Sequence, residues 1–239
     1  MAPIVIHLRK AEDSRDIVHR AVQALSEGKL VVFPTETVYG VGASARSNGG
    51  VARIFGAKGR PDQEPLALVV RGVEDALDYA PRMGPRAERL ARRCWPGPVT
   101  LVVASGQEGL VTQLPPDVQQ AVAPSGEVGL RSPAHEIVYE VMQMLVGPIA
   151  LTSANRSGAP PAATADQAVR DLGGDVAVVL DDGPCRYGQP STVVRVDQSG
   201  FHCLREGVVP LSAIQRHASM LILIVCTGNT CRSPMAEGV

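Results

Sequence analysis

A lysine and an arginine stand two residues apart in the segment AKGRPDQEP, where Lys58 and Arg60 precede Pro61. Lysine supplies a point charge and arginine a forked donor, so such a pair before a proline-stiffened loop suits a polyphosphate. Cations at a helix C-terminus also interact favourably with the helix dipole, which by itself explains the pair equally well. The pair indicates an anion site only if other segments point to the same chemistry.

Short polar side chains follow two apolar runs. In FPTETVYGVG a strand breaks at Pro34 and presents Thr35 and the carboxylate of Glu36 before a glycine turn, and in PIALTSANRSG a strand ends in Ser153 and Asn155. Small hydroxyl and amide groups hold a nucleotide or an amino acid through hydrogen bonds, although they also occur in ordinary turns. These segments are further candidate parts of a site.

Arginines mark two more strand ends, Arg131 in VGLRSPAH and Arg205 in HCLREG. From such a position a guanidinium reaches a carboxylate or a phosphate, and exposure at the surface is the alternative for both. A separate run of arginines from Arg82 to Arg93 is typical of a solvated helix face.

The composition excludes several classes of protein. The 239 residues carry a formal net charge of −1 at pH 7 and only 3% are aromatic, which argues against charge-driven nucleic-acid binding and against a base-stacking platform. Five cysteines, odd in number and without metal-ligand spacing, indicate neither a disulfide framework nor a zinc site. No apolar run approaches the roughly 20 residues of a membrane span, and the charged start is unlike a secretory signal, so we expect a cytoplasmic protein.

Helical and extended patterns alternate along the chain. A helix is expected from Ser14, its N-cap, to a stop at Gly28, followed by the buried strand LVVF. Other helices are expected over 50–57, up to 94, over 135–145 and after 164, and other strands over 66–70, 99–103, 128–131, 149–152, 176–180, 192–196 and 201–204. The alternation predicts an α/β fold with a twisted mixed sheet covered by helices.

Two segments interrupt this alternation. Residues 107–126 read as an exposed loop or hairpin excursion. A short polar helix near 212–220 marks the boundary between a domain of residues 1–212 and a segment of residues 213–239, in which a linker precedes a second apolar strand.

As an ordered series, the segments resemble one family. FPTETVYGVG, IFGAKGRPDQEPLALVV, WPGPVTLV, VGLRSPAH, TSANRSG, STVV and REG are similar to the threonylcarbamoyl-AMP synthase family, the YrdC-type proteins, from about Gly28 to Gly207. The resemblance implies a twisted α/β sheet around a concave, positively charged cavity. It also implies that L-threonine, bicarbonate and ATP are combined into threonylcarbamoyl-adenylate and pyrophosphate, for the threonylcarbamoyladenosine (t6A) modification of tRNA.

The resemblance further assigns roles to matching positions. The nucleotide side comprises Lys58, Arg60, Asn155, Ser191 and Arg205, and the threonine side comprises Thr35, Arg131 and Ser153, with Arg131 clamping the carboxylate. Lys58 and Arg60, with Mg²⁺ on the ATP, would offset the repulsion between an attacking carbamate and the α-phosphate, so neither a nucleophilic side chain nor a protein metal site is required. Expected partners are tRNA threonylcarbamoyl-transfer proteins. Direct contact with tRNA or double-stranded RNA, and an RNA-binding module without catalysis, stay open.

The last residues carry a different signal. In LILIVCTGNTCRSPMAEGV an apolar strand leads into Cys226, Arg232 follows after five residues, and Ser233 opens a possible helix, a pattern that lowers a thiol pKa and cradles a phosphate. The motif resembles the start of the low-molecular-weight protein tyrosine phosphatases, in which Cys226 would be the nucleophile and Arg232 the phosphate clamp. Because such a domain needs an aspartate acid and roughly 100 further residues for its core, we expect an inert fragment of a fusion.

Overall fold

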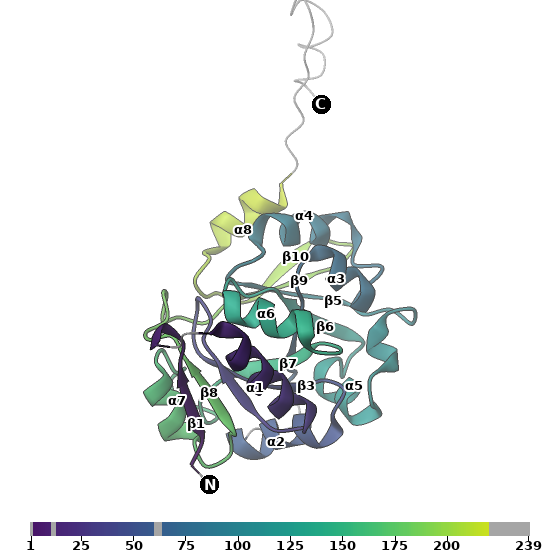
Figure 1. The fold of residues 1–239 in the computed structure, drawn as a ribbon. Coiled ribbons are helices and arrows are strands. Elements are labelled where there is room, and N and C mark those ends of the chain that lie inside the picture. The colour runs from purple at the N-terminus through teal and green to yellow at the C-terminus, as the bar shows by residue number, and fades with distance from the viewer. Residues whose placement is uncertain (1, 11–12, 60–63, 220–239) are drawn as a thin grey trace, which may run out of the picture.

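Ten strands form one mixed sheet in the computed structural model, which describes residues 2–10, 13–59 and 64–219 (Figure 1). The order across the sheet is β1-β8-β2-β3-β7-β4-β6-β5-β9-β10. The strands are β1 (Ile4–His7), β2 (Val31–Phe33), β3 (Gly40–Ser44), β4 (Ala67–Val69), β5 (Val99–Ala104), β6 (Glu127–Arg131), β7 (Ile149–Ser153), β8 (Val178–Asp181), β9 (Thr192–Val196) and β10 (Phe201–Arg205).

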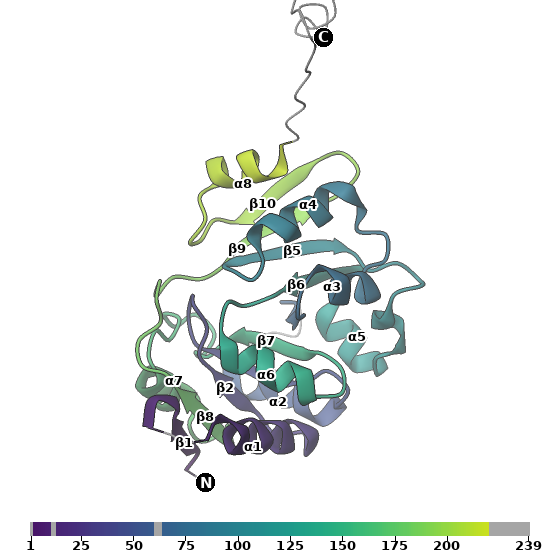
Figure 2. The same cartoon turned by 45° about the horizontal axis from the view of Figure 1, so that its top comes forward.

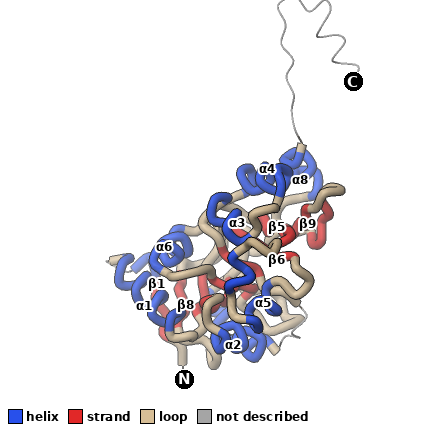
Figure 3. The backbone as a smooth tube through the Cα atoms, turned by 90° about the vertical axis from the view of Figure 1, so that its right-hand side faces the viewer, coloured by secondary structure: helices blue, strands red, loops and turns tan. Residues whose placement is uncertain are grey.

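Helices surround the sheet on the outside, as the blue segments of Figure 3 show. They are α1 (Ser14–Ser26), α2 (Asn48–Lys58), α3 (Val73–Tyr79), α4 (Gly84–Cys94), α5 (Pro116–Val122), α6 (Glu136–Met144), α7 (Ala165–Leu172) and α8 (Leu211–Ala218), with short 3-10 turns η1 (Leu8–Lys10) and η2 (Leu110–Gln113). No helix in the described ranges is long and apolar enough to cross a bilayer.

The strand directions are mixed, as the sequence predicts. Parallel pairing joins β1 to β8, β8 to β2, β4 to β6 and β5 to β9, whereas the other neighbours are antiparallel. β8 is therefore inserted between β1 and β2, although it follows them in sequence by more than 140 residues.

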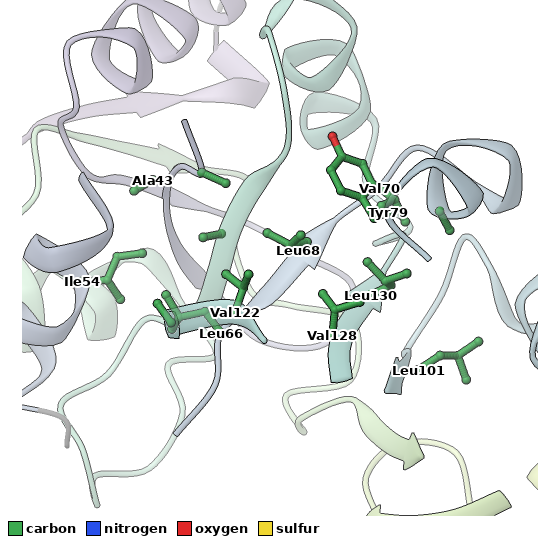
Figure 4. Close-up of a cluster of buried hydrophobic side chains, with 14 of the residues drawn as sticks. Ala43, Ile54, Leu66, Leu68, Val70, Tyr79, Leu101, Val122, Val128 and Leu130 are labelled. Atoms are coloured by element: carbon green, nitrogen blue, oxygen red, sulfur yellow. The ribbon is translucent and has the colours of Figure 1, made fainter. Parts of the chain in front are cut away.

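Two apolar clusters cover the two faces of the sheet. On one face, α1 and α6 pack together against β2, β7 and β8, with Leu25, Phe33 and Val141 fully buried. On the other face a larger cluster joins the sheet to α2, α5 and α7, and Figure 4 shows Ile54, Leu68 and Val122 within it. The expected fold class, a twisted mixed sheet covered by helices, is confirmed.

Three local expectations differ from the structure. The glycine turn expected after FPTETVY is strand β3, whose Gly42 lies against Ile149 and Leu151 so closely that a Cβ atom would stand 2.6 Å from Ile149 Cγ2. The expected loop at 107–126 contains η2 and α5, which begins with Pro116 in its first turn and buries Val118. The N-cap of α1 is Asp13, whose carboxylate accepts from Arg15 N at 2.8 Å, and not Ser14.

Helix α8 packs beside α4, as Figures 1 and 2 both show. Its Ile214 is fully buried in the larger cluster. Arg93 Nη1 donates to the carbonyls of His217 and Ser219 at 2.8 and 2.9 Å, and Arg89 Nη1 donates to Ala218 O at 3.1 Å. These guanidiniums therefore satisfy carbonyl groups at the C-terminal end of α8.

Candidate active site

A cavity of about 370 Å³ opens on the face of the sheet that α1 and α6 share, over β4, β6, β5 and β9. Val69 and Leu151 belong both to the apolar cluster under those helices and to the cavity wall. Five of the predicted site residues line this one cavity, namely Thr35, Arg131, Ser153, Ser191 and Arg205. The strand-end segments that the sequence analysis identified separately thus line the same cavity.

The loop between β2 and β3 forms one end of the cavity through a directed chain of hydrogen bonds. Thr35 donates its single hydroxyl hydrogen to Val38 O at 2.6 Å, so Thr37 must be the donor in the 2.8 Å contact between the two hydroxyls. Arg131 Nη2 in turn donates to Thr37 Oγ1 at 2.8 Å. The Thr35 hydroxyl therefore has no hydrogen left for a ligand, and the loop is held rigidly against Arg131.

Arg131 also forms a buried ion pair. Its Nη2 lies 2.8 Å from Glu36 Oε1, and both side chains are more than 90% buried. The second carboxylate oxygen, Oε2, accepts from Ala134 N at 3.0 Å. The neighbouring nitrogen of the guanidinium, Nε, is buried without a hydrogen-bond partner among the described residues. Such an orphaned donor is uncommon in folded proteins and points to a group that the described chain does not supply.

The end of β7 and the end of α2 are joined by Lys58. Its ammonium is buried and donates to the carbonyls of Ser153 and Asn155 at 2.5 and 2.6 Å. Asn155 Nδ2 donates to Arg156 O and Ala159 O, whereas Asn155 Oδ1 is buried without a partner among the described residues. Lys58 and Asn155 are not part of the cavity lining, so the structure places them as supports of the Ser153 loop.

The other end of the cavity is built by β9 and β10. Arg205 Nη2 donates to Ser191 O at 3.0 Å and approaches Ser191 Oγ at 3.3 Å, while that hydroxyl lies 3.0 Å from Thr100 Oγ1. The pairing of β10 with β9 is irregular between Cys203 and Arg205, and the intervening Leu204 lies on the cavity wall with 55% of its surface exposed. Polar and apolar surfaces therefore alternate at this end.

A second cavity of about 360 Å³ lies on the other side of the β2–β3 loop and shares Thr35 with the first. Glu36, His135, Asp182 and Cys185 line it. Burial lowers the pKa of His135, against the attraction of Asp182 at 3.4 Å, and burial raises the pKa of the Cys185 thiol to about 11. Both groups are thus neutral at pH 7.

Three predicted site residues and the run of arginines remain to be placed. Arg60, Cys226 and Arg232 lie outside the described residues, so their predicted roles stay predictions. The arginines from Arg82 to Arg93 each make contacts within the chain. Arg82 pairs with Glu108, Arg92 with Glu74, and the others donate to backbone carbonyls.

The sequence analysis did not predict that Glu36 and Thr37 bind Arg131. The segment FPTETVYG contains the signal, a carboxylate between two threonines directly after a buried strand. Burying such a charge is costly unless it pairs with a cation. Among the described residues no group of three or more histidine, cysteine or acidic side chains is placed to hold a metal ion.

These features define an α/β protein whose sheet carries a cavity with guanidinium and hydroxyl groups at its two ends. The chain belongs to the Sua5/YciO/YrdC family, because that family's model, described as telomere recombination, matches residues 23–207. The expectation of a YrdC-type protein is confirmed for this part of the chain.

Named relatives agree with this assignment. The threonylcarbamoyl-AMP synthase of Pyrococcus abyssi is 38% identical over 215 residues, which are 89% of this chain and 60% of that protein. The threonylcarbamoyl-AMP synthase of Mus musculus is 34% identical over 201 residues, 80% of this chain and 67% of that protein. The crystal structure of P. abyssi Sua5 complexed with L-threonine is similar with a TM-score of 0.79 at 35% identity, covering 91% of this chain and 61% of that chain.

Proposed function

We propose that the chain forms threonylcarbamoyl-AMP and pyrophosphate from L-threonine, bicarbonate and ATP. The single observation that carries the proposal is the meeting, in one cavity, of the three residues predicted for threonine with Ser191 and Arg205, two of those predicted for the nucleotide. Relatives named threonylcarbamoyl-AMP synthase support the same activity. The chain spans about 60% of the length of the Pyrococcus protein, so the activity is a proposal for the residues present here.

The chemistry follows from the charges. The threonine amine combines with bicarbonate to a carbamate with loss of water, and a carbamate oxygen then attacks the α-phosphorus of ATP while pyrophosphate leaves. An anion approaches an anion in this step, so cations and fixed donors must supply the stabilisation. Arg131 and Arg205 stand at the two ends of the cavity, and Lys58 supports the loop that carries Ser153. Arg60 is assigned to the phosphates from the sequence, by its spacing from Lys58 and by the family resemblance.

Mg²⁺ belongs to the proposal as the ion that accompanies the ATP phosphates. Its hard oxygen preference is met by the phosphates together with water, without a dedicated protein cage. A cytoplasmic location and transfer of the product to tRNA by partner proteins are also part of the proposal.

The decisive experiment is pyrophosphate release from ATP and bicarbonate, with and without L-threonine, coupled to mass identification of the adenylate. We expect release that depends on threonine and falls strongly in Arg205→Ala. The matched control is Arg82→Ala, which removes an exposed guanidinium paired only with Glu108 in the described contacts. Threonine-independent release, or an equal effect of both variants, would contradict the proposal.

The terminal motif is a separate matter. Its resemblance to a phosphatase loop is a prediction from the sequence, and Cys226 and Arg232 lie outside the described residues. Hydrolysis of an aryl phosphate, compared between the chain and Cys226→Ser, tests it. We expect no hydrolysis in either protein, and activity that disappears in the variant would overturn that expectation.

A further inference from the structure

The Glu36–Arg131 pair separates two cavities. Arg131 lines the candidate active site, whereas Glu36 lines the cavity on the other side of the β2–β3 loop. Glu36 is fixed at three atoms, because Oε1 accepts from Arg131 Nη2, Oε2 accepts from Ala134 N, and its backbone carbonyl accepts from Tyr187 N at 3.0 Å. It therefore reaches the candidate active site only through Arg131.

In this arrangement one nitrogen of the guanidinium is committed to the protein and another is not. Nη2 is bound to Glu36 Oε1 and Thr37 Oγ1, both at 2.8 Å. Nε, which lies beside Nη2 in the guanidinium, is buried without a partner among the described residues. Because a guanidinium is planar and presents its donors in a fixed fork, holding Nη2 at two contacts determines the direction in which the other donors point.

The pair also sets the charge at this end of the cavity. A buried guanidinium without a counter-ion attracts any anion, and the polyphosphate of ATP carries far more negative charge than an amino acid. With Glu36 at 2.8 Å the pair has no net charge. A zwitterion such as threonine still gains a hydrogen bond to its carboxylate there, but a polyphosphate loses most of its electrostatic attraction.

We propose that Glu36 is a positioning and specificity residue, which orients Arg131 towards a substrate carboxylate and keeps polyphosphate out of the amino-acid end of the cavity. The inference rests on the proposed function and deepens it. A carboxylate with only a structural role would stabilise the fold without affecting the choice between ligands. Selectivity between threonine and phosphate is therefore the quantity to measure.

The test uses Glu36→Gln in the full chain. In pyrophosphate release, we expect the KM for threonine to rise about 10- to 100-fold, which is the loss that follows when one charge-assisted hydrogen bond to a ligand is misaligned. The KM for ATP and kcat should change by less than about threefold, since a positioning role at the amino-acid end leaves the nucleotide contacts intact. Inorganic tripolyphosphate should become a competitive inhibitor against threonine in the variant and not in the wild type.

Two controls separate this role from a general loss of stability. Asp75→Asn removes the carboxylate of another arginine pair, Asp75 with Arg71 at 2.7 Å, which lines neither cavity, and it should leave the KM for threonine unchanged. In an Arg131→Ala background the Glu36→Gln substitution should have no further effect on that KM, because its action passes through Arg131.

Each outcome decides the matter. Threonine-dependent release with the same KM for threonine in Glu36→Gln and wild type would overturn the inference and leave the proposed function standing. If Glu36→Gln does not fold, Glu36→Asp keeps the charge and shortens the side chain. An equal rise of the KM for threonine and the KM for ATP in that variant would also overturn the inference. If the wild type shows no threonine-dependent release, the proposed function fails, and calorimetric titration with threonine still tests whether Glu36 governs its affinity.

Discussion

Replacing Lys58 by methionine separates two roles that an alanine scan would confuse. The resemblance assigns Lys58 to the nucleotide phosphates, but the structure shows its ammonium holding the carbonyls of Ser153 and Asn155 at 2.5 and 2.6 Å. Methionine keeps the length and apolar volume of the stem while removing the charged donor. If the structural role is real, Lys58→Met loses stability in the absence of any ligand.

Those two contacts account for the following part of the expected loss. Hydrogen bonds from a charged donor contribute about 1.5–3 kcal/mol each, so two give about 3–6 kcal/mol. Part of this is offset because the side chain is only 4% exposed and the variant no longer buries an ammonium, which leaves an expected decrease of about 2–4 kcal/mol in the free energy of unfolding. For a domain of this size the melting temperature should fall by about 4–16 °C.

Urea denaturation of the ligand-free protein, followed by circular dichroism, measures this decrease. The same samples are then assayed for pyrophosphate release below their unfolding midpoint. A variant with the wild-type midpoint and no activity would refute the reasoning, because Lys58 would then act only on the ligand. A destabilised variant whose folded fraction keeps full activity would show instead that Lys58 has no part in phosphate binding.

Three further predictions concern the scaffold. Gly42→Val should destabilise the fold by about 1–3 kcal/mol in urea titrations, because its Cβ would stand 2.6 Å from Ile149 Cγ2, whereas Gly49→Ala, with open space around it, should not. Burial lowers the pKa of His135 below 6.5, so the unfolded chain binds more protons than the folded protein. The free energy of unfolding should therefore fall as the pH drops from 7.5 towards 5.5. An unchanged pH slope in His135→Asn would contradict this. Arg93→Ala should speed amide exchange in the last turn of α8 and in no other helix, as it removes the donor to His217 O and Ser219 O, and Arg82→Ala serves as the comparison.

Most of the sheet was predictable because its strands are continuous apolar runs bounded by turn residues. The runs that became β4, β5, β6, β7 and β9 needed no tertiary information. Strand β3 was hidden because glycine normally indicates a turn, and only the close approach of Ile149 and Leu151 explains why Gly40 and Gly42 stand in a buried strand. Helix α5 was hidden by two prolines, of which Pro116 occupies the first helical position.

The residues of the site were largely predictable from the sequence, but the hydrogen bonds between them were not. Strand-end position was enough to nominate Arg131, Ser153 and Arg205, and the family resemblance added Ser191; all four share one cavity. The direction in which each side chain donates or accepts was not predictable, because the sequence does not reveal which atoms already form hydrogen bonds within the chain. The committed Thr35 hydroxyl, the Glu36 counter-ion and the carbonyl contacts of Lys58 each depend on partners that are far apart in sequence or on loop geometry.

The insertion of β8 between β1 and β2 has a consequence for synthesis on the ribosome. Within the described part of the chain β1 pairs only with β8, through the register Ile4 to Val178, so this strand lacks that partner until about 175 residues have followed it. At 5–20 residues per second that delay is roughly 9–35 s. During this time the edge of β2 that β8 later covers is open, and Ile4 and Val5 are unpaired apolar residues near the start of the chain. The nascent protein should therefore expose this strand edge until β8 emerges, and its folding should be slow for its size.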